Sequence, residues 1–205
     1  MHMKRSLILV CLLALAIPLT TFGQKTHTIH VKRVINAPAA VVWKAAAKDY
    51  GEVSNWHRYL YTSNYVEGSL IGVKGARRMC NFNEKGTRWL KEEIGSLDDK
   101  NMVMKNLIIG AAKFPMDTEN SYAYTRVTDN GDNTATLSYE LVYRTKPAFM
   151  GGLAKGKFKR MLNELQIGVE HYVTTGEILN ATTGNWKDVK KKYKKEGKYK
   201  GDYSE

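Results

Sequence analysis

Two side chains in this sequence, Glu92 and His57, have the chemistry of a general acid or base. A carboxyl or imidazole group moves protons efficiently when its pKa lies near the working pH. Glu92 alternates with Leu90 and Ile94, so the three side chains point to one face of a predicted strand. That face is otherwise apolar, and an apolar setting raises the pKa of a carboxyl group unless a cation pairs with it. Glu92 is therefore a candidate catalytic residue.

Arg78 is the cation that could pair with Glu92. It lies on the preceding strand-length run, and residues on the two strands of a hairpin oppose one another. A pair of this kind can bind a polar group of a ligand, or it can serve only to hold the two strands together. Both interpretations are open from the sequence.

No other catalytic or metal-binding pattern is present in the sequence. It contains no HExxH, paired CxxC or GxSxG motif. A metal site needs clustered ligands, whereas the histidines are scattered along the chain. We therefore expect neither a metal nor a cofactor, and His57 is the one histidine that we would test as an acid or base.

Three tyrosines on strand-length runs, Tyr122, Tyr124 and Tyr139, offer hydroxyl groups on mostly apolar side chains. Such side chains suit the binding of an amphipathic ligand. The same three residues could equally be ordinary aromatic side chains of the core.

The chain begins with the pattern of an export signal. Lys4 and Arg5 precede an uncharged apolar run, residues 7–17, and small residues follow up to Gly23. The run is too short to cross a bilayer core of about 30 Å as a stable anchor. We expect residues 1–23 to be a cleaved signal peptide, and the mature protein to be periplasmic or secreted; an uncleaved anchor is the alternative.

One domain is expected over residues 24–180. Alternation predicts a strand over Thr26–Ile35, with Val31 on its more apolar face, and two short helices follow. The same alternation over Thr134–Tyr143 puts Leu137 and Tyr139 on one face of a later strand. Over residues 59–145, strand-length runs are joined by short loops such as Asn83–Gly86, which requires an antiparallel meander. Apolar residues at spacings of three and four then predict one long amphipathic helix over Phe149–Leu179.

The chain after Asn180 differs in composition. From Lys187 onward, eight lysines stand against four acidic residues, which contributes +4 to a total net charge of +12. Aliphatic residues are almost absent there, so the segment buries too little apolar surface to offset its ordering. Residues 181–205 are expected to form a flexible lysine-rich tail, and the aromatic residues between its lysines would suit an anionic membrane surface.

Four further cations crowd the start of the predicted long helix: Lys155, Lys157, Lys159 and Arg160. Positive charge at this end opposes the helix dipole. These side chains could face solvent, or they could meet an acidic head group of a ligand.

Several short motifs together resemble a known superfamily. They are Val34-Ile35-Asn36-Ala37-Pro38, Val41-Val42-Trp43, Gly75-Ala76-Arg77-Arg78, Glu92-Glu93-Ile94 with Asp98-Asp99, and Gly152-Leu153 near the start of the long helix. Their order and spacing resemble the START-like (SRPBCC) superfamily, especially its polyketide cyclase/dehydrase and lipid-transport branch, over about residues 26–177. The resemblance implies an α+β helix-grip fold: a curved antiparallel sheet of about seven strands wrapped around a long C-terminal helix, with two short helices after the first strand.

The resemblance also implies a ligand cavity between the sheet and the long helix. The carboxylate position that matches Glu92 often faces the cavity in that superfamily, and Trp56 and His57 fall in its helical lid region. The ligand-binding candidates are Trp56, Tyr59, Arg78, Glu92, Tyr122, Tyr124 and Tyr139.

We expect an exported, monomeric protein that binds a small hydrophobic or amphipathic, lipid-like ligand without turnover. A cyclase/dehydrase-like enzyme that uses Glu92 or His57 on an apolar substrate is one alternative. A protein that binds anionic membrane surfaces through its basic tail is another. No nucleic-acid partner is expected.

Overall fold

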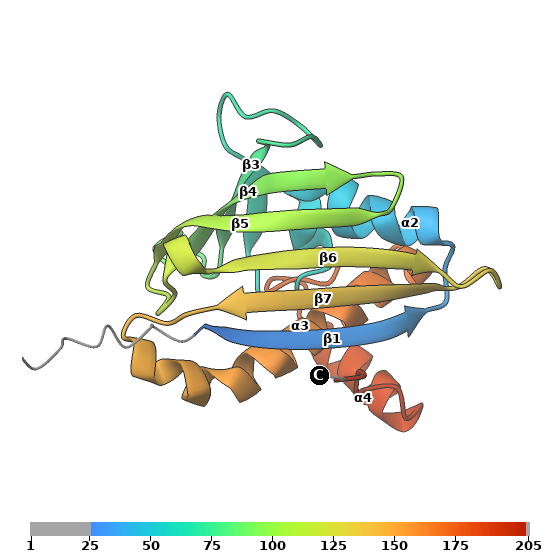
Figure 1. The fold of residues 1–205 in the computed structure, drawn as a ribbon. Helices are drawn as coiled ribbons and strands as arrows, with labels where there is room; N and C mark the ends of the chain where they lie inside the picture. Colours follow the sequence, from blue (N-terminus) through green and yellow to red (C-terminus); the bar gives the residue numbers. More distant parts are fainter. Residues whose placement is uncertain (1–25, 204–205) are drawn as a thin grey trace, which may run out of the picture.

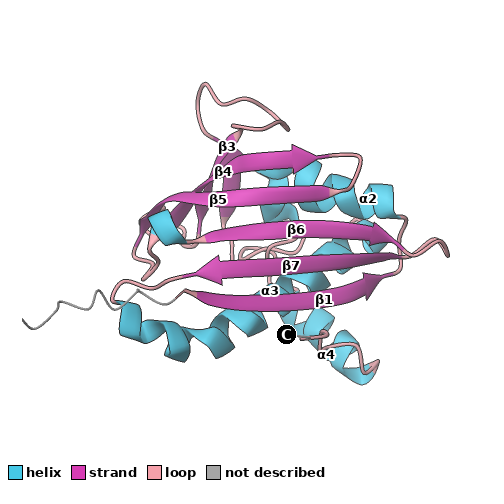
Figure 2. Cartoon of the chain, in the orientation of Figure 1, coloured by secondary structure: helices cyan, strands magenta, loops and turns pink. Residues whose placement is uncertain are grey.

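The computed structural model describes residues 26–203, and the predicted signal peptide lies outside them. Its main layer is a seven-stranded antiparallel sheet with the strand order β1-β7-β6-β5-β4-β3-β2 (Figures 1 and 2). The strands are β1 (His27–Ile35), β2 (Thr62–Tyr65), β3 (Arg77–Asn81), β4 (Trp89–Asp98), β5 (Val103–Ala112), β6 (Tyr122–Asp129) and β7 (Ala135–Tyr143). From β2 to β7 each strand pairs with the next in sequence, which confirms the predicted meander.

The helices are α2 (Ala39–Trp43), the π-helical turn η1 (Lys44–Lys48), the 3₁₀ turns η2 (Tyr50–Asn55), η3 (Thr118–Asn120) and η4 (Ala148–Met150), α3 (Gly151–Thr175) and α4 (Trp186–Lys195). Of these, α2 and the long helix α3 lie on one side of the sheet (Figure 1). The long helix α3 packs against β1 and β7. This arrangement confirms the predicted α+β helix-grip fold.

Helix α3 is shorter than the predicted span at both ends. Its first residue is Gly151, after the 3₁₀ turn η4, and it ends at Thr175 because Gly176 adopts a left-handed conformation with φ of 76°. A glycine in this position is a common helix terminator, since it lacks the Cβ that makes positive φ costly.

The pairing of β4 with β5 is irregular, unlike that of the other strands. The pairing of β4 with β5 shifts register between Lys91 and Glu92 and again between Ile94 and Ser96. Register shifts of this kind are β-bulges, which bend a strand and increase its twist. Gly95 lies inside the second one, where a Cβ atom would be 2.9 Å from the Leu107 side chain. Glu92 lies directly at the first of these bulges.

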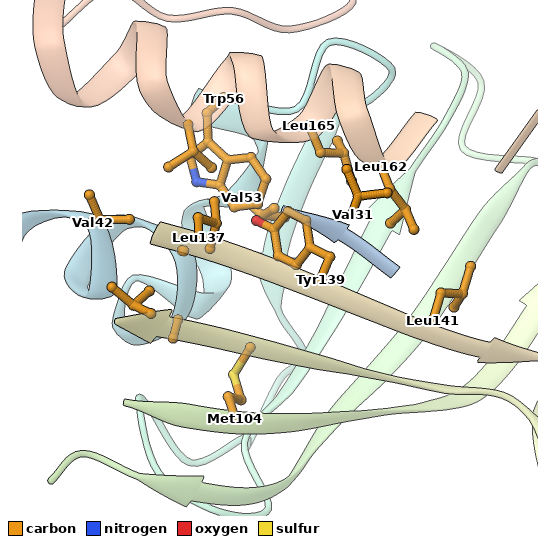
Figure 3. Packing of buried hydrophobic residues seen from close by; sticks show 14 of the residues in the cluster. Val31, Val42, Val53, Trp56, Met104, Leu137, Tyr139, Leu141, Leu162 and Leu165 are labelled. Atoms are coloured by element: carbon orange, nitrogen blue, oxygen red, sulfur yellow. The ribbon is translucent and has the colours of Figure 1, made fainter. Parts of the chain in front are cut away.

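The core lies between the sheet and α3. In Figure 3, Leu162 and Leu165 from α3 point toward the sheet, where they face Val31, Leu137 and Tyr139. The five side chains are buried and belong to one continuous apolar cluster. The alternation predicted for β1 and β7 is confirmed, because the inward residues are those that the pattern assigned to the buried face.

The segment expected to be a flexible tail is folded. Val189 and Tyr193 of α4 are buried against Ile167 and Leu179, with Trp186 and Tyr199 packed around them. Farther along, the backbone of Asp202 pairs with that of Lys32 on β1. The composition argument failed because a few large side chains, placed one turn apart on a helix, suffice to bury one face.

Polar contacts tie the same segment to the domain. The buried guanidinium of Arg33 donates hydrogen bonds to the carbonyl oxygen of Lys198 at 2.8 Å and to Asn163 Oδ1 at 3.1 Å. Asn163 Nδ2 in turn donates to the carbonyl oxygen of Tyr199 at 2.8 Å. Burying an arginine is costly unless its N–H donors are hydrogen-bonded. The hydrogen bond from Arg33 to the Lys198 carbonyl therefore stabilises both the buried guanidinium and the C-terminal segment.

Candidate functional site

Two adjoining cavities lie between the sheet and α3. The deep cavity has a volume of about 120 Å³ and reaches the polar groups of β3 and β4. The mouth cavity has a volume of about 440 Å³ and lies beside the first turns of α3. Phe82 and Met161 line both cavities. A ligand that occupies both would pass between these two side chains.

Arg78 and Glu92 form the polar centre of the deep cavity. They oppose one another in the register of β3 and β4, and Arg78 Nε donates to Glu92 Oε2 at 2.8 Å. The predicted pairing is therefore confirmed. Arg78 also donates to the carbonyl oxygen of Tyr50 at 2.8 Å, and Asn106 Nδ2 donates to Glu92 Oε1 at 2.6 Å.

The pairing reverses the pKa shift expected for an isolated Glu92. Burial by itself would raise the pKa of this carboxyl, but the charge of Arg78 and hydrogen bonds from Arg78 and Asn106 lower it below its ordinary value. Glu92 is an ionised hydrogen-bond acceptor at neutral pH. It therefore lacks the proton that a general acid must supply.

The lid segment that follows η2 places Trp56 and His57 over the deep cavity, and both side chains are buried. His57 Nδ1 accepts a hydrogen bond from the backbone N–H of Tyr59 at 3.3 Å. Burial lowers the pKa of His57 to about 3, and the charges of Arg78 and Arg58 act in the same direction. The imidazole is neutral, and because Nδ1 is an acceptor we assign its proton to Nε2.

The lid is pressed tightly against α3. Trp56 Nε1 donates to the carbonyl oxygen of Ala45 at 3.1 Å, which fixes the indole ring. The carbonyl oxygen of Trp56 approaches Gly168 so closely that a Cβ atom there would lie 1.9 Å away. Only glycine allows this contact, so Gly168 sets the distance between the lid and the helix.

Tyr139 brings an unpaired hydroxyl group to the deep cavity. The residue is 7% exposed, and its Oη has no hydrogen-bond partner among the described residues. Thr125 lies opposite Tyr139 in the register of β6 and β7 and also lines the cavity. A buried hydroxyl without a partner costs about 1–3 kcal/mol, so Tyr139 is available to a polar atom of a bound molecule.

Tyr122 and Tyr124 do not reach either cavity, contrary to the prediction. Their neighbours Ala123 and Thr125 line the deep cavity, so the two tyrosines point to the opposite face of β6. There the Lys105 ammonium lies 4.3 Å from the Tyr122 ring centroid. The register of β6 with β7 decides which face of β6 points inward. That register cannot be read from the sequence of β6 alone.

The mouth cavity has aromatic walls and a cationic rim. The Phe82 and Phe114 rings meet edge to face with centroids 4.6 Å apart, and the Arg88 guanidinium lies 4.4 Å from the Phe114 centroid. Tyr59 and the cations Lys157 and Arg160 complete this part of the lining. None of the described residues that line the mouth is a carboxylate.

Sequence reasoning identified only part of this mouth. Tyr59 was a candidate, and Lys157 and Arg160 were recognised as cations at the start of the long helix. Phe82, Arg88 and Phe114 were missed. Phe82 and Arg88 flank the predicted hairpin loop Asn83–Gly86, so a search of loop-flanking aromatic and basic residues could have found them.

The described residues contain no group of three His, Cys, Asp or Glu side chains that could hold a metal ion. No helix among residues 26–203 has the length and apolar character needed to span a bilayer.

The sequence matches one family model, described as polyketide cyclase / dehydrase and lipid transport, over residues 26–170. The chain belongs to the polyketide cyclase/dehydrase and lipid transport family. This confirms the resemblance read from the sequence motifs. A search of curated proteins gives no significant match.

Solved structures share the fold of this family member at low sequence identity. Ara h 8.0201 has a TM-score of 0.60 and 19% identity, covering 74% of this chain and 99% of its own. XoxI from Bacillus cereus has a TM-score of 0.60 and 17% identity, covering 72% and 96%. Norcoclaurine synthase from Thalictrum flavum, in complex with dopamine and hydroxybenzaldehyde, has a TM-score of 0.56 and 15% identity, covering 73% and 87%.

The family match ends at residue 170, before α4, yet the C-terminal segment is connected to the mouth. Glu164, 1% exposed, accepts hydrogen bonds from Arg58 and Tyr59 and from the Tyr199 hydroxyl at 2.7 Å. Burial alone would raise the pKa of Glu164, but these hydrogen bonds lower it below its ordinary value. Through Glu164, Tyr59 of the mouth is fixed by Tyr199 of the segment beyond the family match.

Proposed function

We propose that this family member is an exported binding protein for an amphipathic, lipid-like molecule with an acidic head group. The observation that carries the proposal is the pair of adjoining cavities, with apolar walls inside and cations at the rim. The apolar body of the ligand lies between the sheet and α3. Its acidic group pairs with Arg88, Lys157 and Arg160 at the mouth, where no lining carboxylate among the described residues competes for them.

The inner end of the ligand meets a different environment. The charges of Arg78 and Glu92 neutralise each other, so a further charge there would have no counter-ion. The Tyr139 hydroxyl and the His57 Nε2–H can bind a carbonyl or hydroxyl oxygen. A ligand with a neutral polar atom at its inner end therefore fits better than one with two charged ends.

Binding without turnover is favoured over cyclase-like catalysis. Glu92 has a lowered pKa, and the pKa of His57 is about 3, so neither group is matched to proton transfer near neutral pH. The fold alone leaves both activities possible, since norcoclaurine synthase has the same fold and binds dopamine and hydroxybenzaldehyde. Turnover of an apolar substrate that is lost in His57→Ala would contradict the proposal.

The test uses a fluorescent probe with fused apolar rings and one sulfonate, anilinonaphthalene sulfonate. The mature protein should enhance its fluorescence, and oleate should displace it. Met161→Trp places an indole between the two cavities and should abolish displaceable binding, because Met161 lines both. Leu70→Trp is the matched control, since Leu70 lies on an exposed loop outside both linings. Equal oleate binding by wild type and Met161→Trp would overturn the proposal.

A further inference from the structure

Two of the most exposed apolar side chains in the described part of the chain lie beside the mouth cavity. Phe149 is 79% exposed and Leu153 is 81% exposed. They are four residues apart, in η4 and the first turn of α3. Met150 and Leu153 also line the mouth. An apolar patch therefore adjoins the opening through which a ligand would enter.

Cations flank this patch in the chain and line the mouth beside it. Lys157 and Arg160 are exposed on the following turns of α3, and both line the mouth together with Arg88. Lys146, with 63% of its side chain exposed, lies on the other side of Phe149 in the chain. The carboxylate nearest to it, Asp117, is buried and already paired with Arg144 and Lys146. Exposed apolar side chains next to cations complement a bilayer that has an apolar interior and anionic head groups.

The helix end that carries the patch is anchored at Gly151, whose carbonyl oxygen accepts a hydrogen bond from Tyr143 Oη at 2.8 Å, and is largely exposed beyond it. The first turn of α3 has no side-chain cap and no acidic residue. Gly152 lies in this turn and Gly156 in the next, and a Cβ atom at either would have nothing within 4 Å. Glycine is thus not required for space, and it lowers helix stability.

Two other surfaces do not combine exposed apolar side chains with cations at the mouth of a cavity. The loop between β2 and β3 exposes Leu70 and Ile71, at 58% and 72%, but neither lines a cavity at the mouth. Helix α4 exposes lysines, but its apolar residues Val189 and Tyr193 are buried against the domain. Contact through α4 would therefore be purely electrostatic.

We propose that the η4–α3 end docks on an anionic lipid bilayer with the mouth facing the head groups. An amphipathic ligand then moves between bilayer and cavity without crossing water. The transferred cargo rests on the proposed function, whereas docking does not. The lysine-rich α4, part of the tail that the sequence offered as an alternative membrane contact, is not the primary contact.

Vesicle sedimentation tests the docking. Wild type should bind phosphatidylcholine vesicles only when they contain phosphatidylglycerol, and salt should weaken binding. Phe149→Ser/Leu153→Ser should lose about tenfold or more in affinity, because two apolar side chains no longer enter the interface. The matched control, Leu70→Ser/Ile71→Ser, should change affinity less than about twofold, as should Lys191→Gln/Lys192→Gln on α4, whose charges lie outside the contact.

Three results would overturn the proposal: no binding by wild type, an equal loss in the Leu70→Ser/Ile71→Ser control, or a larger loss in the α4 variant. Sedimentation velocity tests the other possible partner of the patch, which is a second copy of this chain. A wild-type dimer that Phe149→Ser converts to a monomer would also overturn docking on lipid.

Anilinonaphthalene sulfonate binding without vesicles separates this proposal from the proposed function. Phe149 does not line the mouth cavity, so Phe149→Ser should retain probe affinity. Vesicle binding without probe binding would refute the ligand and leave docking supported. Probe binding without vesicle binding would refute docking alone.

Discussion

The deep end of the site and its mouth are built in opposite ways, although α3 forms a wall of both. From Leu162 to His171 every residue of α3 is buried, and Gln166 Nε2 donates to the carbonyl oxygens of Val31 and Leu137 at 2.8 and 2.9 Å. From Gly152 to Lys157 most residues are exposed, with two glycines and no cap. The same helix is thus a buried wall at the deep end and a largely exposed one at the mouth.

Breaking the ion pair at the deep end should have the largest effect. Glu92→Gln leaves Arg78 buried without its counter-charge, so the free energy of unfolding at pH 7 should fall by about 3–5 kcal/mol. Chemical denaturation gives this value. The control is Glu93→Gln, whose ion pair with Arg77 is more exposed and should contribute no more than about 1 kcal/mol. Equal effects of the two changes would mean that the deep pair is no more important than a surface pair.

Alanine at glycines on the two halves of α3 should act with opposite signs. Gly168→Ala places a Cβ atom 1.9 Å from the Trp56 carbonyl oxygen and should destabilise the protein by about 2–3 kcal/mol. Gly152→Ala meets nothing within 4 Å and should stabilise it by up to about 1 kcal/mol. Thermal unfolding measures both. Stopped-flow probe uptake should be slower in Gly152→Ala if opening of the mouth limits entry, and a loss of stability there would refute the contrast.

Acid should weaken the deep end through His57. The pKa of His57 falls from about 6.5 in the unfolded chain to about 3 in the folded protein. As the pH falls, His57 is therefore protonated in the unfolded state before it is protonated in the folded state. The contribution of neutral His57 to the free energy of unfolding is complete above about pH 6.5. It is lost as the pH falls toward 3, by at most about 1.4 kcal/mol per pH unit. Denaturation of wild type and His57→Phe between these pH values gives the difference. If the free energy of unfolding depends on pH in the same way for both proteins, the pKa of His57 is not lowered by folding.

Local patterns were sufficient to predict the elements that surround the site. Alternation in Thr134–Tyr143 identified the inward face of β7, including Tyr139, and the neighbouring runs of β3 and β4 identified the Arg78–Glu92 pair. Both depend on contacts within one strand or between adjacent strands. The fold class followed from the order of such elements.

What could not be predicted depends on register and on contacts between distant segments. Tyr122 and Tyr124 were assigned to the cavity because β6 alone does not show which of its faces packs on α3. The C-terminal segment was expected to be flexible because its anchors, Arg33, Asn163 and Glu164, belong to elements far away in sequence. Phe114 became a wall of the mouth only by meeting Phe82 from another hairpin.

The reactivity of Cys80 can report whether the deep cavity is open. It is the one cysteine among residues 26–203, it lines that cavity, and burial raises the pKa of its thiol to about 12. Only the thiolate reacts with an alkylating reagent. Cys80 should therefore remain unlabelled while the cavity is closed, and it should react when opening exposes the thiol to solvent and reagent. The labelling rate of Cys80 therefore reports how readily the deep cavity opens, and a ligand that fills the cavity should slow the labelling.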